Sequence, residues 1–310
     1  MGFSVGIISS DFLPDADPKE RNSYGNEQII KEAEKAFDKV FAIDPSATYV
    51  DIDGREARVI HWYRDSKGIE RHLDLGGELD GLIVKRTRNF GDQIYDLITV
   101  LAGNKKLAIY DPPDSYHRPL TKVTSKMLRF PEIRQPRSTI LNSANLPTNF
   151  VLKYPVFAKP THGYRGLDSR VCNSRKELEE YISAGKYSDF GYGALLEEKL
   201  DTTEEFRVIV IGGKAFDVSV GKINDGKDVN NKYQGGEFFS RNHDLVLRTA
   251  ESAAEAQGLS FAGVDIVYQG GKCFVLECNR NPDFEEFDKA TGLDTASHFI
   301  DYVKNDLSKK

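Results

Sequence analysis

Hydrophobic and polar positions alternate along the first third of the chain in a pattern that predicts an α/β lobe. Apolar residues recur at helical spacing over 29–37, where Asn26 is a candidate N-cap, and again over 94–101. Two turn signals, Asp53-Gly54 and 66–68, separate alternating segments and predict a β-meander. Continuous apolar runs predict buried strands: 3–8, 40–43, 81–84 and 107–110.

From about residue 114 onward, strands and helices alternate with longer polar segments between them. The predicted helices are 122–128, 175–182, 245–256 and 295–303, with Asn173 or Ser174 as the cap of the second. The predicted strands are 138–141, 155–160, 195–200, 206–211, 215–220, 263–267 and 272–277. Because 310 residues are too many for one compact core, we expect two or three lobes.

Composition excludes several classes of protein. A content of 39% hydrophobic and 29% charged residues is typical of a soluble globular chain, and no apolar stretch is long enough to predict a membrane span. The N-terminus lacks a basic region and predicts a first strand rather than a signal peptide. Three cysteines without metal-ligand spacing favour a reducing, cytoplasmic compartment. A net charge of −6 argues against nucleic acid as a partner.

Basic residues nevertheless crowd one third of this acidic chain. Two interpretations stay open: a solvated basic surface, or a pocket for a polyanion. Arg86 and Arg88, just after the predicted strand 81–84, are candidates to hold an acidic group of a substrate, because a guanidinium can bind a carboxylate bidentately. The cluster comprises Lys85, Arg86, Arg88, Lys105, Lys106, Arg118, Lys122, Lys126, Arg129, Arg134 and Arg137.

Three hard oxygen ligands lie on two adjacent predicted strands near the C-terminus. Asp265 is on the first strand of this hairpin, and Glu277 and Asn279 are on the second, two residues apart and so on one face. Oxygen ligands without histidine or cysteine suit Mg²⁺ or Mn²⁺ and disfavour zinc. A hydrogen-bond network at a sheet end explains the three side chains equally well.

A lysine at the end of an apolar strand, Lys159, is followed by glycines at 163 and 166. A lysine beside a glycine loop is a phosphate-binding arrangement, because glycines let backbone N–H groups approach an anion closely. Lys122 is a second candidate contact to a nucleotide. Glu197 and Glu198 could read the polar edge of a purine, and Glu205 could accept hydrogen bonds from ribose hydroxyls. Each acid taken alone is also explained as a surface residue.

The order of these residues along the chain resembles the ATP-grasp superfamily. The segments Ala158-Lys159-Pro160, Leu196-Glu197-Glu198-Lys199-Leu200, Glu205-Phe206-Arg207-Val208, Gly263-Val264-Asp265-Ile266 and Leu276-Glu277-Cys278-Asn279-Arg280-Asn281-Pro282 carry the resemblance. Gly235-Gly236 after Asn231 is similar to a loop of the RimK-like branch, which contains carboxylate–amine ligases. The resemblance covers about residues 115–305. It implies an α/β fold with α+β lobes: a pre-ATP-grasp domain at 1–114, a central lobe at 115–195 and a C-terminal lobe with the metal site at 196–310.

The resemblance also implies roles for single residues. It places Arg207 at the transferred phosphoryl group, and Asp265, Glu277 and Asn279 around two Mg²⁺ ions for which Mn²⁺ can substitute. Cys278 is then expected on the opposite face of its strand. Asn231 is assigned to the substrate, and Arg86 and Arg88, which lie outside the resemblance, stay candidates for the same role on the residue pattern alone. The residues assigned to ATP are Lys122, Lys159, Gly163, Gly166, Glu197, Glu198, Leu200 and Glu205.

The activity implied is that of an ATP-dependent ligase joining a carboxylate to an amine. An acyl phosphate forms first, an amine then attacks it, and ADP and phosphate are released. The carboxylate is an amino acid, a peptide or a protein side chain; neither the acceptor nor the oligomeric state is determined, a homo-oligomer included. Two alternatives remain at this point: a kinase on the same fold, which would yield a stable phosphoester, and a nucleotide-binding regulatory protein without turnover.

Overall fold

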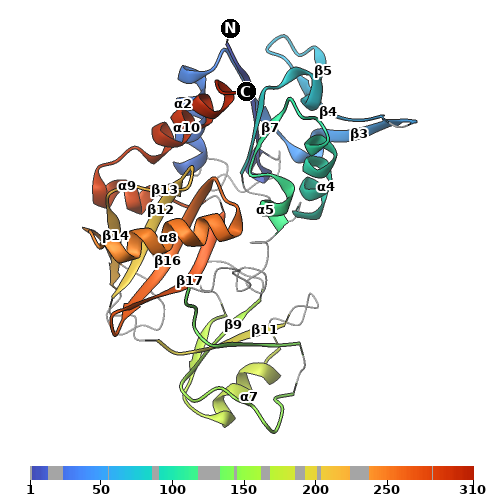
Figure 1. Ribbon diagram of the computed structural model, residues 1–310. Helices are drawn as coiled ribbons and strands as arrows, with labels where there is room; N and C mark the ends of the chain where they lie inside the picture. Colours follow the sequence, from blue (N-terminus) through green and yellow to red (C-terminus); the bar gives the residue numbers. More distant parts are fainter. Residues whose placement is uncertain are drawn as a thin grey trace. The chain divides into compact units, whose positions relative to one another are not determined.

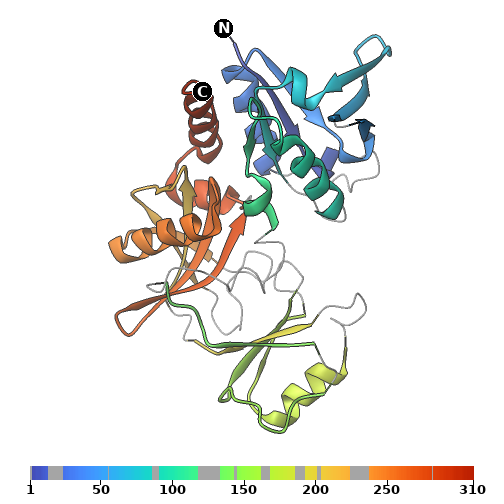
Figure 2. The same ribbon diagram turned by 45° about the vertical axis from the view of Figure 1, so that its right-hand side comes forward.

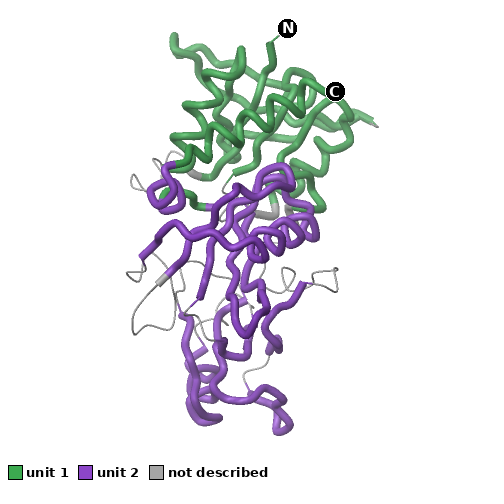
Figure 3. Tube along the Cα trace, turned by 60° about the vertical axis from the view of Figure 1, so that its left-hand side comes forward, with its two compact units in different colours: residues 1–117, 283–285, 293–310 green, residues 118–282, 286–292 purple. Residues whose placement is uncertain are grey.

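The chain folds into two compact units, each built on β-sheets covered by helices (Figures 1 and 2). In this computed structural model the described residues are 2–12, 24–54, 56–85, 91–117, 133–142, 145–161, 168–185, 193–200, 204–223, 237–280 and 282–310. Unit 1 contains residues 1–117, 283–285 and 293–310, and unit 2 contains residues 118–282 and 286–292 (Figure 3).

Unit 1 is built on a four-stranded parallel sheet in the order β2-β1-β6-β7. The apolar runs of the sequence form its strands: β1 (Ser4–Ile8), β2 (Lys39–Ile43), β6 (Gly81–Val84) and β7 (Ala108–Tyr110). The connecting helices are α2 (Tyr24–Ala36) and α4 (Gly91–Ala102), with the short α5 (Pro113–His117) after β7. The predicted cap was wrong, because Asn26 lies inside α2 and is buried, with its amide donating to the Ser9 hydroxyl at 3.4 Å.

The predicted β-meander is confirmed as a three-stranded antiparallel sheet in the order β3-β4-β5. Its strands are β3 (Thr48–Asp53), β4 (Glu56–Arg64) and β5 (Glu70–Asp74), with the 3₁₀ turn Pro45–Ala47 before them and the short helix α3 (Leu75–Glu78) after them. His61 on β4 is 4% exposed, and its Nδ1 lies 3.1 Å from the carbonyl oxygen of Ala47. Burial lowers the pKa of His61, although the Ala47 carbonyl and Asp44 oppose this effect.

Helix α10 (Thr295–Leu307), at the end of the chain, belongs to unit 1 and packs against α2. The Tyr110 hydroxyl, at the end of β7, donates to the carboxylate of Asp306 at 2.8 Å. The sequence placed this helix in a C-terminal lobe ending at 310, whereas the structure groups it with the first strands. The expected division at 1–114, 115–195 and 196–310 stays a prediction.

Unit 2 contains a first sheet in the order β10-β9-β11-β8. Its strands are β8 (Ser138–Leu141), β9 (Val156–Pro160), β10 (Arg170–Cys172) and β11 (Ala194–Glu198), and α7 (Arg175–Ser183) covers one face. Leu178 and Ile182 of α7 pack on Ala158 and Leu196 of the sheet. Because side chains alternate along a strand, Lys159 and Glu197 project from the face opposite α7.

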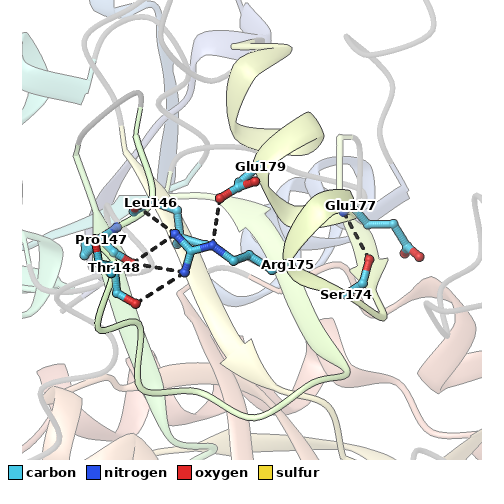
Figure 4. A network of polar contacts seen from close by, with 7 residues as sticks. All are labelled: Leu146, Pro147, Thr148, Ser174, Arg175, Glu177 and Glu179. Carbon is cyan, nitrogen blue, oxygen red and sulfur yellow. Dashed lines mark hydrogen bonds and ion pairs between the residues drawn. The ribbon is translucent and has the colours of Figure 1, made fainter.

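The first turn of α7 is hydrogen-bonded to the segment between β8 and β9 (Figure 4). Ser174 caps the helix, as its hydroxyl accepts from the backbone N–H of Glu177 at 3.2 Å. The Arg175 guanidinium donates to the backbone carbonyls of Leu146, Pro147 and Thr148 at 3.3–3.4 Å, while its Nε donates to Glu179 at 2.8 Å. One arginine therefore satisfies three carbonyls of a segment that lacks regular structure.

The second sheet of unit 2 follows the order β15-β14-β12-β16-β17, with β13 (Lys214–Ala215) paired to β12. The strands are β12 (Glu205–Ile211), β14 (Ser219–Ile223), β15 (Glu237–Arg241), β16 (Phe261–Gln269) and β17 (Lys272–Arg280). Helix α8 (Asp244–Gln257) crosses one face, and α9 (Glu285–Thr291) follows β17. Val246, Ala250 and Ala253 of α8 pack on Phe206, Val264 and other apolar residues of the sheet, forming its core. The predicted strand 215–220 is in fact interrupted, since β13 ends at Ala215 and β14 begins at Ser219, and each pairs separately with β12.

Candidate functional site

Three charged residues stand side by side on three neighbouring strands of the second sheet. Arg207 of β12 is directly opposite Asp265 of β16, and Asp265 is directly opposite Glu277 of β17. Directly opposed residues share a face of the sheet, and here it is the face away from α8. Asn279 lies on the same face, opposite Gly263. We call this row, with its neighbours Glu205 and Lys222, the charged ladder.

A one-residue bulge in β17 makes the ladder possible. Ile266 pairs with Val275, but the next residue back along β16, Asp265, pairs with Glu277, so that Leu276 has no counterpart. Before the bulge Cys273 and Val275 face the core, and after it Cys278 does, 2% exposed, as the sequence analysis expected. The extra residue reverses the alternation and brings Glu277 and Asn279 to the face that holds Asp265.

Asp265 is bound by two cations at once. The Arg207 guanidinium donates to both carboxylate oxygens, from Nε at 2.6 Å and from Nη2 at 2.8 Å. The Lys222 ammonium lies 2.7 Å from the same Oδ1. Burial opposes ionisation of Asp265, but Arg207 and Lys222 together lower its pKa to about 2. Gly263 leaves room on this face, because a Cβ there would clash with the ring of Pro282 and would also lie 3.3 Å from Nη1 of Arg207.

Lys222 is a residue of the ladder that the sequence analysis missed. Its side chain is 4% exposed, and its ammonium lies 2.8 Å from Glu205 as well as 2.7 Å from Asp265. Burial alone would lower the pKa of Lys222, but Asp265 and Glu205 raise it above its ordinary value. One signal could have revealed it: Lys222 lies two residues after Val220 in β14, so the two side chains share a face of the strand, and Val220 is buried.

The ladder fits a hard divalent cation at its β17 end. Two carboxylates directly opposite on neighbouring strands repel one another unless a cation lies between them. Within the described part of the chain, the Glu277 side chain makes no hydrogen bond or ion pair, so its oxygens are available to a metal. No group of three or more His, Cys, Asp or Glu residues arranged for a metal occurs there. The predicted set differs from such a group, because its third ligand is the amide of Asn279.

The first sheet of unit 2 carries a second polar group, on the face opposite α7. The Lys159 ammonium lies 2.5 Å from the Glu197 carboxylate, and the lysine side chain is 11% exposed. The Ser138 hydroxyl donates to the other oxygen of Glu197 at 3.3 Å. The structure therefore pairs two residues that the sequence assigned to different parts of ATP. A buried lysine held by one carboxylate keeps donors that an anion could accept from.

The other predicted ATP contacts divide into two groups. Glu198 accepts from the backbone N–H of Arg137 at 3.0 Å, and Leu200 accepts from the Lys199 ammonium through its carbonyl at 2.9 Å. Both lie at the end of β11, and their contacts to adenine stay predictions. The remaining ATP candidates lie outside the described residues: Lys122, Gly163 and Gly166. The substrate candidates also lie outside them: Arg86, Arg88 and Asn231.

Solved structures with the same architecture are ATP-grasp ligases. The chain is similar to the ATP-grasp ligase PsnB complexed with a minimal precursor, with a TM-score of 0.67 and 16% identity over 99% of both chains. PsnB has also been solved with its minimal precursor, Mg and ADP, at a TM-score of 0.67. A D-alanine–D-alanine ligase from Bacillus anthracis aligns with a TM-score of 0.66 and 13% identity over 99% of this chain and 98% of the other. The predicted fold class is confirmed.

The sequence comparisons define the family. Residues 121–303 match the model of the RimK-like ATP-grasp domain, and the chain therefore belongs to that family. A protein described as a probable alpha-L-glutamate ligase of Pseudoalteromonas translucida is 23% identical over 316 residues, covering 99% of this chain and 97% of the relative. One of Aliivibrio fischeri is 24% identical over 319 residues, covering 99% and 97%.

The predicted class of enzyme, an ATP-dependent carboxylate–amine ligase, is confirmed at this level. A kinase or a non-catalytic regulatory protein is the less favoured interpretation, because relatives that match nearly the whole chain are described as ligases. In the described part of the chain, no helix combines the length and the apolar character needed to cross a membrane.

Proposed function

We propose that the protein joins the carboxylate of an amino acid or peptide to an amine through an acyl phosphate, releasing ADP and phosphate. The observation that carries this proposal is the charged ladder in a chain of the RimK-like family. Arg207, Asp265 and Glu277 form a continuous row across three strands, which suits a phosphoryl group and the cation that accompanies it. Glutamate is the first substrate to test, because the relatives are described as alpha-L-glutamate ligases.

In the proposed reaction the substrate carboxylate attacks the γ-phosphorus of ATP and the bond to the β-phosphate oxygen breaks. The amine then attacks the acyl carbon, and phosphate leaves with the electron pair of the broken C–O bond. Lys159 binds the phosphates, and Arg207 moves from Asp265 to the transferred phosphoryl group, where its planar fork donates two hydrogen bonds. No nucleophilic side chain is required, because positioning and charge neutralisation supply the catalysis.

Asp265, Glu277 and Asn279 would hold Mg²⁺. When bound, the ion neutralises phosphate charge and orients the terminal phosphoryl group. The number of ions and the substitution of Mn²⁺ for Mg²⁺ belong to the same proposal. The residues fit the ion because they are hard oxygen donors on one face and because Glu277 makes no ion pair among the described residues. Glu205 would bind the ribose, and Glu197, Glu198 and Leu200 the adenine.

The test is a reaction with ATP, Mg²⁺, glutamate and peptides that end in glutamate. We expect release of ADP and phosphate that depends on the amino acid, and a product heavier than the peptide by one glutamyl residue in mass spectrometry. Hydroxylamine in place of the amine should give the hydroxamate of the activated carboxylate. AMP and pyrophosphate as products would contradict the acyl phosphate, and a stable phosphoester without free phosphate would indicate the kinase.

A further inference from the structure

We propose that Lys222 is a positioning residue of this site, whose ammonium fixes Glu205 and Asp265 for the nucleotide and the metal while Arg207 serves the phosphoryl group. The inference rests on the proposed function, because it assigns Lys222 a task in binding Mg-nucleotide. None of the sequence motifs includes this lysine. The contacts of its side chain carry the proposal.

Lys222 is buried together with the two carboxylates that it binds. It is directly opposite Glu205 in the pairing of β14 with β12, and it reaches past that residue to Asp265 on β16. The side chains of Lys222, Glu205 and Asp265 are 4%, 7% and 10% exposed. Buried charges are costly unless they are paired, so the removal of the ammonium would leave two carboxylates with too little positive charge.

The Lys222 ammonium connects two side chains with different proposed roles. Glu205 is at the ribose end of the ladder, and Asp265 is at its metal end. One ammonium with three donors fixes both side chains, one at 2.8 Å and the other at 2.7 Å. A change at Lys222 should therefore affect the nucleotide and the metal together.

Arg207 donates to both carboxylate oxygens of Asp265 in this structure. In the proposed reaction Arg207 leaves Asp265 for the phosphoryl group, and the Asp265 oxygens that it vacates would help to hold the metal. The Lys222 ammonium contacts Oδ1 of Asp265, and the residue is buried. It can therefore stay on Asp265 during the exchange and keep the carboxylate oriented.

The experiment measures binding of ADP by calorimetry, with and without Mg²⁺, in Lys222→Met, Lys222→Arg and wild type. Lys222→Met keeps the length of the side chain without its charge, and we expect it to weaken Mg-ADP binding about tenfold or more. Lys222→Arg keeps the charge, and we expect its affinity to stay within about threefold of wild type. Lys214→Met, at a lysine of β13 that is 82% exposed, is the matched control and should bind as wild type does.

A structural role alone would lower the unfolding temperature of Lys222→Met and leave its Mg-ADP affinity unchanged, which would overturn the inference. If Lys222→Met does not fold, the double variant Glu205→Gln with Lys222→Met is measured instead, because it removes the charge of Lys222 together with that of Glu205. Its loss of Mg-ADP affinity should then exceed that of Glu205→Gln alone, and an equal loss would overturn the inference. Failure of the wild type to bind Mg-ADP would instead overturn the proposed function itself.

Discussion

Arg207 and Asp265 face each other on neighbouring strands, and the guanidinium of the first donates to both oxygens of the second at 2.6 and 2.8 Å. The proposed metal ligand and the proposed phosphoryl ligand are thus bound to each other in this structure. Because a metal and a guanidinium compete for the same oxygens, binding of Mg²⁺ should release Arg207. Metal binding would thereby free the Arg207 guanidinium to bind the phosphoryl group.

Replacing Arg207 by lysine should separate binding from turnover. Lysine can still pair with Asp265, but it cannot reproduce two parallel hydrogen bonds to phosphoryl oxygens. We expect Arg207→Lys to bind ATP nearly as wild type does and to release phosphate about 10²–10³-fold more slowly. Arg58→Lys, in an exposed pair with Asp51 in unit 1, is the control and should be fully active. Full activity of Arg207→Lys would remove the arginine from the reaction.

Glu277→Gln should raise the Mg²⁺ requirement of the enzyme. The change keeps the shape of the side chain and removes one negative charge from a pair of directly opposed carboxylates. We expect the Mg²⁺ concentration that gives half-maximal ADP binding to rise about tenfold or more. Glu255→Gln, an exposed change on α8, should leave that concentration unchanged. An unaltered Mg²⁺ dependence in Glu277→Gln would place the metal elsewhere.

Ser174→Ala should destabilise the start of α7 by about 1 kcal/mol, because the hydroxyl caps the backbone N–H of Glu177. Hydrogen exchange of the α7 amides measures this change locally. Ser183→Ala, at the other end of the same helix, removes an exposed hydroxyl and should have little effect. Equal protection in the two variants would mean that the cap contributes nothing to this helix.

The stability of unit 1 should fall as the pH falls below about 6.5 because of His61. Its pKa is lowered in the folded chain, so the unfolded chain binds a proton first. The stability contribution is therefore complete above the unfolded pKa and is lost as the pH falls toward the folded pKa. The fluorescence of Trp62, the single tryptophan, reports urea unfolding of this unit.

We expect the free energy of unfolding to decrease less between about pH 7.5 and about pH 5.5 in His61→Gln than in wild type, since glutamine does not titrate across the ordinary histidine pKa of about 6.5. His72→Gln, whose ring lies in the same sheet with its side chain 54% exposed, is the control and should keep the wild-type pH dependence. An unchanged slope in His61→Gln would assign the sensitivity to other groups.

The sequence predicted most of the strands and helices because their apolar periodicity is local. It placed the end of the second hairpin strand at Glu277, whereas β17 continues to Arg280. The charged ladder interrupts the hydrophobic pattern but not the backbone pairing, so the polarity pattern alone predicts the end of a strand where the strand continues. Helix α10 was predicted correctly, but its place in unit 1 depends on contacts with residues far away in the sequence.

Some residues of the candidate site could be grouped from the sequence, and others could not. Asp265, Glu277 and Asn279 could be grouped from sequence because they stand on one hairpin. Lys222 could not, because its partners Glu205 and Asp265 are 17 residues and more away, and only strand order and register bring them together. Glu197 was predicted as a site residue from the sequence, but its pairing with Lys159 depends on the diagonal register of β11 and β9.

The unpaired Leu276 determines to which face of the sheet each later side chain of β17 points. If Leu276 instead paired with Asp265 in an uninterrupted ladder, Glu277 would stand opposite Val264 and Asn279 opposite Ala262, both toward α8. Cys278 would then stand opposite Gly263 on the other face. The hydrophobic core would receive a carboxylate, and a thiol would enter the row of proposed ligands. Alternation along a strand has only two settings, and in this hairpin the exclusion of one leucine from the pairing selects the setting in which Glu277 faces Asp265.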